Sequence, residues 1–202
     1  MTNGSLQFRD AESIVRLLRS GSVVGIPTDT LPGLACLPDH ALRIWALKQR
    51  PAEKPLILMA DSPTELMDCA RSACRQDALD LASDHWPGPL TMVLPAIQDG
   101  VVQRLNPNGS TVGLRIPHCA ATRDLLRRSG PLATSSANLS GAPSSLSAED
   151  VASAFPELAL LGPGPWPQPS GQASTVLEWL APGRWRILRA GAVIPDGIST
   201  VP

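Results

Sequence analysis

Four polar clusters carry the side chains best suited to chemistry, and most of them follow segments predicted to be strands. Pro-Thr-Asp-Thr at 27–30 offers two hydroxyls and a carboxylate, which can bond a small zwitterion or simply close a turn. Small polar residues at 134–144 let backbone amides and hydroxyls approach a ligand closely. Another cluster pairs Ser174 with Arg189, which comes just before a glycine turn. Sites on α/β sheets form at such strand ends.

The remaining cluster, at 48–55, contains the cations Lys48, Arg50 and Lys54. These cations can satisfy the free carbonyls at the C-terminal end of a helix. They can also grip a polyphosphate, because arginine supplies a bidentate fork and lysine a point charge. Residue chemistry alone leaves both interpretations open.

Several common catalytic patterns are missing from the sequence. There is no G-x-x-x-x-G-K-S/T motif for a P-loop, and no G-x-G-x-x-G motif follows the first predicted strand. A serine nucleophile within 134–144 has neither a G-x-S-x-G elbow nor an obvious histidine base. The cysteines and histidines are scattered: Cys36, Cys69, Cys74, Cys119, His40, His85 and His118. We therefore expect no protein-held metal, and buried or inert thiols in a reducing compartment.

The overall composition is that of one soluble globular domain. The 202 residues are 43% apolar and 17% charged, with a net charge of −1. This balance gives no long-range field to attract nucleic acid, so anion binding must come from a few converging cations. The sequence has no apolar run long enough to cross a membrane, and residues 1–9 are polar. A cytoplasmic protein with no membrane partner is expected.

Predicted helices and strands alternate along the chain. Caps and apolar spacing predict helices between Asp10 and Gly21, over 39–47 (burying Leu42 and Trp45), from Ser62, over 77–83, over 120–129 and from Ser147. Strands are predicted at 22–26, 56–60, 90–94, 111–116, 132–134, 174–179 and 184–189. This order favours a single α/β domain with a twisted, mixed, mostly open sheet flanked by helices. Its core is expected at about 8–192, with a Pro/Gly-rich loop at 162–172 and a tail at 193–202.

Seven short motifs, in this order, resemble the YrdC/Sua5 family of threonylcarbamoyl-AMP synthases. They are Pro-Thr-Asp-Thr (27–30), Lys-Gln-Arg-Pro (48–51), Lys-Pro-Leu-Ile (54–57), Trp-Pro-Gly-Pro-Leu-Thr (86–91), Gly-Leu-Arg-Ile-Pro (113–117), Ser-Ser-Ala-Asn-Leu-Ser-Gly (135–141) and Ser-Thr-Val (174–176). Each motif is weak alone, but the ordered set is specific. The likeness is to the short, single-domain form and implies a YrdC-like fold with a concave active-site face.

The resemblance implies a nucleotidyltransferase that joins L-threonine, bicarbonate and ATP. The products would be L-threonylcarbamoyladenylate and pyrophosphate, and Mg²⁺ would accompany the nucleotide. A separate transferase would then pass the threonylcarbamoyl group to the adenosine beside the anticodon of tRNA.

The resemblance also implies roles for individual residues. ATP would contact Arg50, Lys54, Thr111, Ser136, Ser144 and Arg189. Threonine would be held by Thr30, Arg115, Thr134 and Ser174. The catalytic K-x-R and S-x-N signatures would be Lys48, Arg50, Ser136 and Asn138. The chain departs from many relatives at Pro32, Ala35 and Met59, where they have an aromatic residue, a glycine and, in the longer form, a histidine.

Two other functions fit the same sequence. One is a YrdC-like module that binds RNA or tRNA, for which a basic patch is available: Arg71, Arg75, Arg123, Arg127 and Arg128. On predicted helices these side chains also fit an ordinary solvated face. The other is a paralogue that has lost the synthase activity, and the intact K-x-R and S-x-N signatures argue against it.

Overall fold

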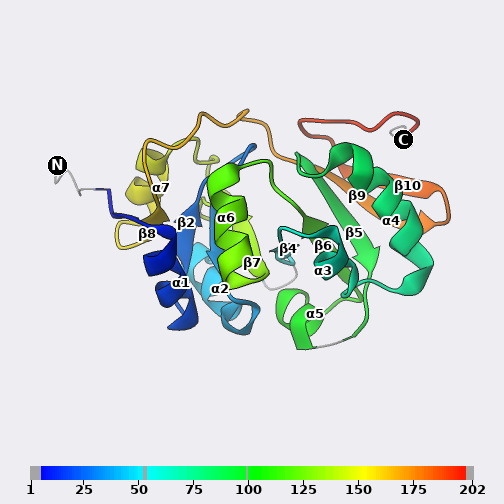
Figure 1. Ribbon diagram of the computed structural model, residues 1–202, viewed down its shortest axis with the longest axis horizontal. Coiled ribbons are helices and arrows are strands. Elements are labelled where there is room, and N and C mark those ends of the chain that lie inside the picture. Colours follow the sequence, from blue (N-terminus) through cyan, green and yellow to red (C-terminus); the bar gives the residue numbers. More distant parts are fainter. Residues whose placement is uncertain (1–5, 52–53, 99, 199–202) are drawn as a thin grey trace.

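A ten-stranded mixed sheet runs through the computed structural model, which describes residues 6–51, 54–98 and 100–198 (Figure 1). In spatial order its strands are β1 (Phe8–Arg9), β8 (Ala159–Leu161), β2 (Val24–Ile26), β3 (Gly33–Cys36), β7 (Leu132–Ser136), β4 (Ile57–Met59), β6 (Thr111–Arg115), β5 (Leu90–Pro95), β9 (Thr175–Ala181) and β10 (Arg184–Arg189). Four neighbouring pairs are parallel (β1–β8, β8–β2, β4–β6, β5–β9) and the others are antiparallel. The prediction of a mixed, open α/β sheet is confirmed.

The helices cover this sheet. Their bounds are α1 (Ala11–Arg19), α2 (Leu42–Lys48), α3 (Pro63–Met67), α4 (Ser72–His85), α5 (Gly100–Leu105), α6 (Ala120–Ser129) and α7 (Ala148–Ala154). Asp10 caps α1 by accepting a hydrogen bond from the Ser13 N–H at 2.7 Å, and Ser147 and Asp150 form a capping box on α7. In the part of the chain that the structure describes, no helix is long and apolar enough to cross a bilayer.

Apolar packing between the helices and the sheet forms the core. One cluster joins Ile14 and Leu18 of α1 to Leu125 and Leu126 of α6, which lies beside α1 (Figure 1). A larger cluster lies under α3 and α4 and includes Trp45 of α2. The four cysteines are all buried, as predicted.

The segment around α2 corrects one prediction. The predicted helix over 39–47 is divided into a 3₁₀ turn at Pro38–His40 and α2, which begins at Leu42. This start turns Leu42 outward, where it is 76% exposed, and α2 instead buries Ile44, Trp45 and Lys48. The prediction that Leu42 is buried was wrong, whereas that for Trp45 is confirmed.

Other elements differ in extent from the predictions. Ser62 precedes α3 without a side-chain capping bond, and the helix predicted over 77–83 extends over the whole of α4. The short strands β1, β3 and β8 and the helix α5 were not predicted. The segment 162–172 is free of helix and strand, as expected. Part of the predicted tail, 199–202, lies outside the described residues, as do positions 1–5 of the polar N-terminal stretch.

Candidate functional site

A cavity of about 230 Å³ lies where several strands in the middle of the sheet end. The register places Ser136 of β7 beside Gly33 of β3, and Met59 of β4 beside Arg115 of β6. The lining comes from segments far apart in the chain: Thr28, Thr30, Leu31, Pro32, Gly33, Arg50, Pro55, Ile57, Met59, Arg115, Thr134, Ser135, Ser136, Asn138, Ser144, Ala173, Ser174 and Arg189.

Most of the site residues predicted from the sequence meet at this cavity. Its lining includes Thr30, Arg50, Arg115, Thr134, Ser136, Asn138, Ser144, Ser174 and Arg189. Three predicted residues are not in the lining. Lys48 is buried, with 1% exposed. Lys54 has an exposed side chain, and Thr111 begins β6, where its oxygens accept hydrogen bonds from Asn106 Nδ2.

Arg115 is the most deeply buried cation of the lining, with 3% of the residue exposed. Its Nη2 pairs with Asp29 Oδ1 at 2.7 Å, Nη1 donates to Thr30 Oγ1 at 2.9 Å, and Nε donates to the Gly88 carbonyl at 3.1 Å. Burial lowers the pKa of Arg115, and the charge of Asp29 opposes that shift. These bonds fix the plane of the guanidinium.

Ser174 and Arg189 form a second fixed group in the lining. Arg189 donates from Nε and Nη2 to the Ser174 carbonyl at 3.1 and 2.8 Å, and Nη2 lies 3.2 Å from Ser174 Oγ. Ser174 Oγ also lies 2.9 Å from Thr91 Oγ1. Burial lowers the pKa of Arg189. The predicted pairing of these two segments is confirmed by the contacts.

Arg50 follows α2 and holds the loop beside it. Its Nε donates to the Lys54 carbonyl and its Nη2 to the Pro55 carbonyl, both at 3.0 Å. Burial lowers the pKa of this guanidinium too. With only these two donors used by the described residues, the remaining N–H groups of Arg50 are available to a ligand in the cavity.

Lys48 lies behind the lining and supports it. Its Nζ donates to the Ser136 carbonyl and lies 3.5 Å from Ser136 Oγ, which itself donates to Asn138 Oδ1 at 2.6 Å. Asn138 Nδ2 donates to the Leu139 and Ala142 carbonyls, both at 2.9 Å. Burial, followed by the charge of Arg50, lowers the pKa of Lys48 to about 8. The K-x-R and S-x-N signatures thus form one connected network.

The described residues of the lining give it a positive net charge. Among the residues that the structure describes, its charged members are Arg50, Arg115 and Arg189, with no aspartate or glutamate. Seven hydroxyl side chains accompany them at positions 28, 30, 134, 135, 136, 144 and 174. Guanidinium groups held in a partly desolvated cavity attract anions strongly, and carboxylates and phosphates match their fork. The cavity is suited to an anionic ligand.

A second hollow, of about 320 Å³, adjoins the cavity and shares Asn138 and Ser144 with it. Leu139, Pro143 and Leu146 give it a partly apolar wall. Two of these leucines are substantially exposed, Leu139 at 38% and Leu146 at 49%. Such a wall suits a planar or apolar part of a ligand whose anionic part lies among the arginines.

Sequence reasoning missed part of the lining. Leu31 and Gly33 were not expected at the site because β3 was not predicted. The sequence left open whether Asp29 binds a ligand or closes a turn, and in the structure its Oδ1 accepts bonds from Arg115 and from the His118 N–H. The sequence did contain a sign of this ion pair, because Asp29 follows one predicted strand and Arg115 lies near the end of another.

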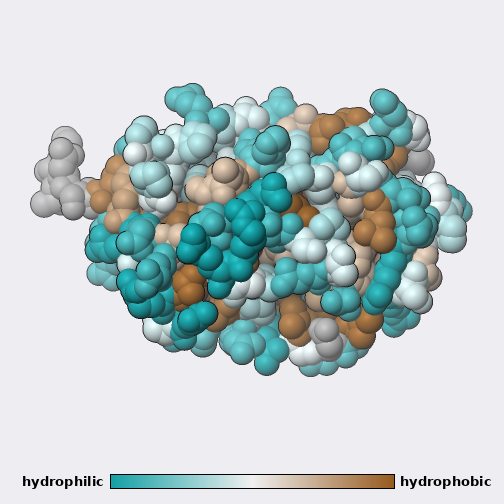
Figure 2. All heavy atoms as spheres, in the orientation of Figure 1, coloured by the Kyte–Doolittle hydropathy of each residue, from teal (hydrophilic) through white to brown (hydrophobic). Residues whose placement is uncertain are grey.

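The arginines considered for RNA binding have other partners. Arg71 and Arg75 donate to the backbone carbonyls of Ala96 and Ala70. On α6 the arginines pair with carboxylates: Arg123 and Arg127 with Asp61, and Arg127 and Arg128 with Asp124. Figure 2 shows this surface over α1 and α6 as strongly hydrophilic. This face carries both signs of charge, and most of its arginines are paired with carboxylates, which makes them less available to phosphates.

Comparisons with known proteins agree with this geometry. A family model named Sua5_yciO_yrdC and described as "Telomere recombination" matches residues 16–191. Human threonylcarbamoyl-AMP synthase is 37% identical over 187 residues, which cover 88% of this chain and 65% of the human protein. The enzyme of that name from Stutzerimonas stutzeri is 34% identical over 72% of this chain and 80% of its own length. The chain therefore spans just under two thirds of the human relative.

The solved structures give the same result. The crystal structure of P. abyssi Sua5 complexed with L-threonine matches with a TM-score of 0.81 and 32% sequence identity. The match covers 90% of this chain and 54% of that one. With the family model, the sequence relatives and the shared fold in agreement, this chain belongs to the Sua5/YciO/YrdC family.

Proposed function

We propose that this protein is a threonylcarbamoyl-AMP synthase, a nucleotidyltransferase that converts L-threonine, bicarbonate and ATP to L-threonylcarbamoyladenylate and pyrophosphate. The observation that carries the proposal is the cavity in which Arg50, Arg115 and Arg189 converge with hydroxyl groups. Two substrates match this lining, because an amino acid offers a carboxylate and a nucleotide offers phosphates. The relatives bear the same activity in their names, and the P. abyssi neighbour holds L-threonine.

In this proposal the amino acid lies against Arg115. The guanidinium forks onto its carboxylate, and hydroxyls of Thr30, Thr134 and Ser174 bond its other polar groups. Apolar side chains complete the pocket, because Ile57 and Met59 also line it. Met59 replaces the histidine of longer relatives, and Pro32 replaces their aromatic residue, so this wall is less polar here.

The nucleotide lies on the other side of the cavity. Its phosphates would meet Arg50 and Arg189, with hydroxyl contacts from Ser136 and Ser144, and its nucleoside would extend into the adjoining hollow. Lys54 and Thr111 are outside the lining, so contact with ATP requires the nucleotide to extend beyond the cavity. We keep both as proposed ATP contacts on the resemblance alone.

The chemical step needs no covalent bond to the protein. Bicarbonate condenses with the threonine nitrogen to form a carbamate, and water is released. A carbamate oxygen then attacks the α-phosphorus of ATP, whose bond to the bridging oxygen of the β-phosphate breaks, and pyrophosphate leaves. The protein aligns the two reactants and stabilises the charge that develops on the leaving phosphates through Arg50 and Arg189. Lys48 and Asn138 act by holding Ser136 in place, which makes them supports of the catalytic loop.

Mg²⁺ enters the proposal as a companion of the nucleotide. The lining offers hydroxyl and amide oxygens, from Ser136 and Asn138, and no carboxylate in the parts of the chain that are described. No group of three or more metal-binding side chains occurs among the residues described. This donor set fits an ion held chiefly by phosphate oxygens and water. Bound there, Mg²⁺ would neutralise phosphate charge.

The place of the protein in the cell is part of the same proposal. We propose that it acts in the cytoplasm and supplies its adenylate to a separate transferase that modifies tRNA. The product is a mixed anhydride of a carbamate and a phosphate, which is a reactive acyl donor and needs a nearby acceptor enzyme. RNA binding by this chain itself gains no support, because the arginines of α6 are paired with carboxylates.

Mass spectrometry tests the proposed activity directly. The purified protein is incubated with L-threonine, bicarbonate, ATP and Mg²⁺, and the mixture is searched for threonylcarbamoyl-AMP. We expect the product and an equal amount of pyrophosphate, and neither when threonine or bicarbonate is omitted. Release of pyrophosphate that does not depend on threonine, or a protein that binds ATP without turnover, would contradict the proposal.

A further inference from the structure

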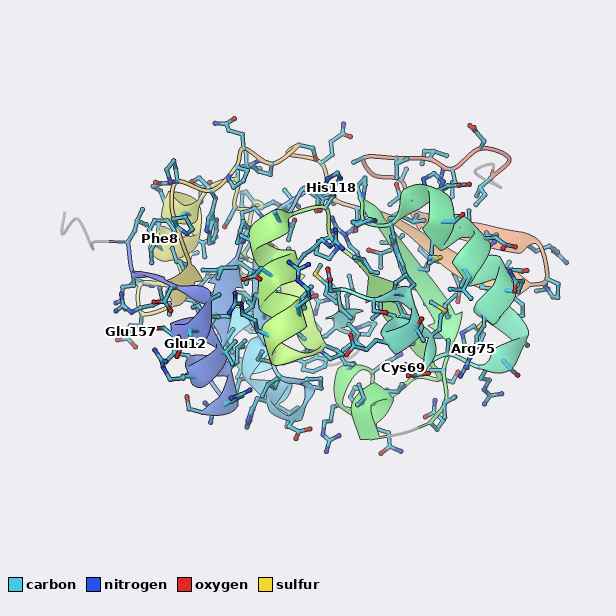
Figure 3. All side chains as sticks on the ribbon, viewed as in Figure 1. Phe8, Glu12, Cys69, Arg75, His118 and Glu157 are labelled. Atoms are coloured by element: carbon cyan, nitrogen blue, oxygen red, sulfur yellow. The ribbon has the colours of Figure 1, made fainter. Side chains whose placement is uncertain are left out.

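Asp29 lies beside the cavity but outside its lining, and it holds the arginine proposed to bind the amino acid. Its Oδ1 accepts from Arg115 Nη2 at 2.7 Å and from the backbone N–H of His118 at 3.0 Å. His118 comes just before α6, and Figure 3 labels it at the upper end of that helix. The side chains of Asp29 and Arg115 are 16% and 4% exposed. Solvent therefore screens this pair weakly.

The loop that carries Asp29 is itself fixed at two points. Thr122 Oγ1 donates to the Pro27 carbonyl at 2.5 Å, and the Ser170 N–H donates to the Asp29 carbonyl at 3.2 Å. The carboxylate thus stands on a backbone that is tied to α6 and to the Pro/Gly-rich segment. A rigid acceptor of this kind sets the orientation of its donor.

The donors of Arg115 are divided between protein and cavity. A guanidinium has five N–H groups. Three are used by Gly88, Thr30 and Asp29. One N–H on each terminal nitrogen has no partner among the described residues, and Arg115 lines the cavity. Two N–H groups on neighbouring nitrogens match the two oxygens of a carboxylate.

We propose that Asp29 is a positioning residue that orients Arg115 to fork onto the α-carboxylate of the amino-acid substrate. The proposal rests on the proposed function, in which L-threonine occupies this cavity. According to this proposal, the protein prefers ligands with a free α-carboxylate because the Asp29 oxygen lies where it orients Arg115 correctly. The negative charge of Asp29 is not what selects, because a carboxylate there repels the carboxylate of the substrate.

Two variants separate position from charge. Asp29→Asn keeps an oxygen at the Oδ1 position, which accepts both observed bonds, but removes the charge. Asp29→Glu keeps the charge and moves the oxygens by one methylene. Calorimetry measures the dissociation constants of L-threonine and L-threoninamide, which lacks the carboxylate. The readout is their ratio, which general damage to the pocket would not change.

We expect wild type to prefer threonine over threoninamide and Asp29→Asn to keep that preference. Asp29→Glu should lose about tenfold of it, because a displaced guanidinium no longer meets both oxygens. The matched control is Asp61→Glu, since Asp61 pairs with Arg123 and Arg127, is 17% exposed and does not line the cavity. This control should behave as wild type.

The outcomes separate the inference from the function on which it rests. If wild type makes threonylcarbamoyl-AMP but Asp29→Glu keeps the full preference, or Asp29→Asn loses it, the inference is overturned and the function stands. If wild type binds neither ligand and makes no product, both are overturned. Should Asp29→Asn fail to fold, Asp29→Glu still decides, because retained preference in that variant contradicts positioning.

Discussion

Arg50→Ala is the perturbation that separates the chemistry of the cavity from the stability of the fold. Arg50 is partly buried, has no carboxylate partner among the described residues and bonds only the Lys54 and Pro55 carbonyls. Its removal leaves no buried charge unpaired. The substitution should therefore affect the phosphate subsite far more than the core.

The two effects differ in magnitude. Loss of two bonds to backbone carbonyls at a half-buried position should cost about 1–2 kcal/mol of unfolding free energy, which lowers the Tm by about 4 °C. Loss of one preorganised cation beside the leaving phosphates should cost about 3 kcal/mol of transition-state stabilisation, or about a hundredfold in kcat. The activity should fall much further than the stability.

Release of pyrophosphate dependent on threonine and bicarbonate measures the first effect, and a thermal melt measures the second. Arg50→Lys keeps a point charge without the fork and should retain part of the activity. Arg43→Ala is the matched control, because Arg43 lies exposed on α2 outside the cavity and should behave as wild type. Near-normal turnover by Arg50→Ala would refute the assignment of Arg50 to the phosphates.

Three further predictions follow from the contacts. Burial lowers the pKa of Lys48 from 10.5 in the unfolded chain to about 8. Wild type should therefore gain about 3 kcal/mol of unfolding free energy relative to Lys48→Met as the pH rises from 8 to 10.5. Denaturant titrations that give the same difference in unfolding free energy at both pH values would contradict this. Gly191→Ala should destabilise the protein and weaken threonine binding, because its Cβ would lie 2.3 Å from the Ala173 carbonyl oxygen; an unchanged melt would show that this backbone yields. Ser136→Ala should lower kcat about tenfold or more with little change in Tm, since it removes a hydroxyl of the lining and leaves the carbonyl that Lys48 holds; unchanged kcat would exclude Ser136 from the chemistry.

Much of the architecture was predictable from local signals. The helices beginning after Asp10 and Ser147 have caps that the structure confirms, and Gly130 ends α6 with a φ of 78°. Strands β5, β6, β9 and β10 have enough apolar or β-branched residues to be identified. These elements depend on their own sequence more than on their neighbours.

The missed elements depend on tertiary contacts. Strand β3 reads Gly-Leu-Ala-Cys and β8 reads Ala-Leu-Leu, neither with β-branched residues, and pairing within the sheet makes them strands. Leu42 looked like part of a buried helical stripe because the 3₁₀ turn before it gives no sequence signal. The conformation of such short segments is set by their contacts with the rest of the fold.

The site, like the fold, was predicted only in part. Most polar residues of the lining were identified because they belong to motifs, whereas separation along the chain does not show which side chains meet. Lys48 was expected to face the phosphates and is instead 1% exposed behind Ser136. Its burial follows from its place on α2, where it lies on the same face as the buried Ile44 and Trp45.

The central claim is that one cavity holds the amino acid and the nucleotide together. A crystal structure of the protein with L-threonine and a non-hydrolysable ATP analogue tests it most directly. We predict the threonine carboxylate on Arg115 and the phosphates between Arg50 and Arg189, with the threonine nitrogen facing the α-phosphorus. Ligands bound in separate places, or phosphates that contact none of these arginines, would contradict the claim.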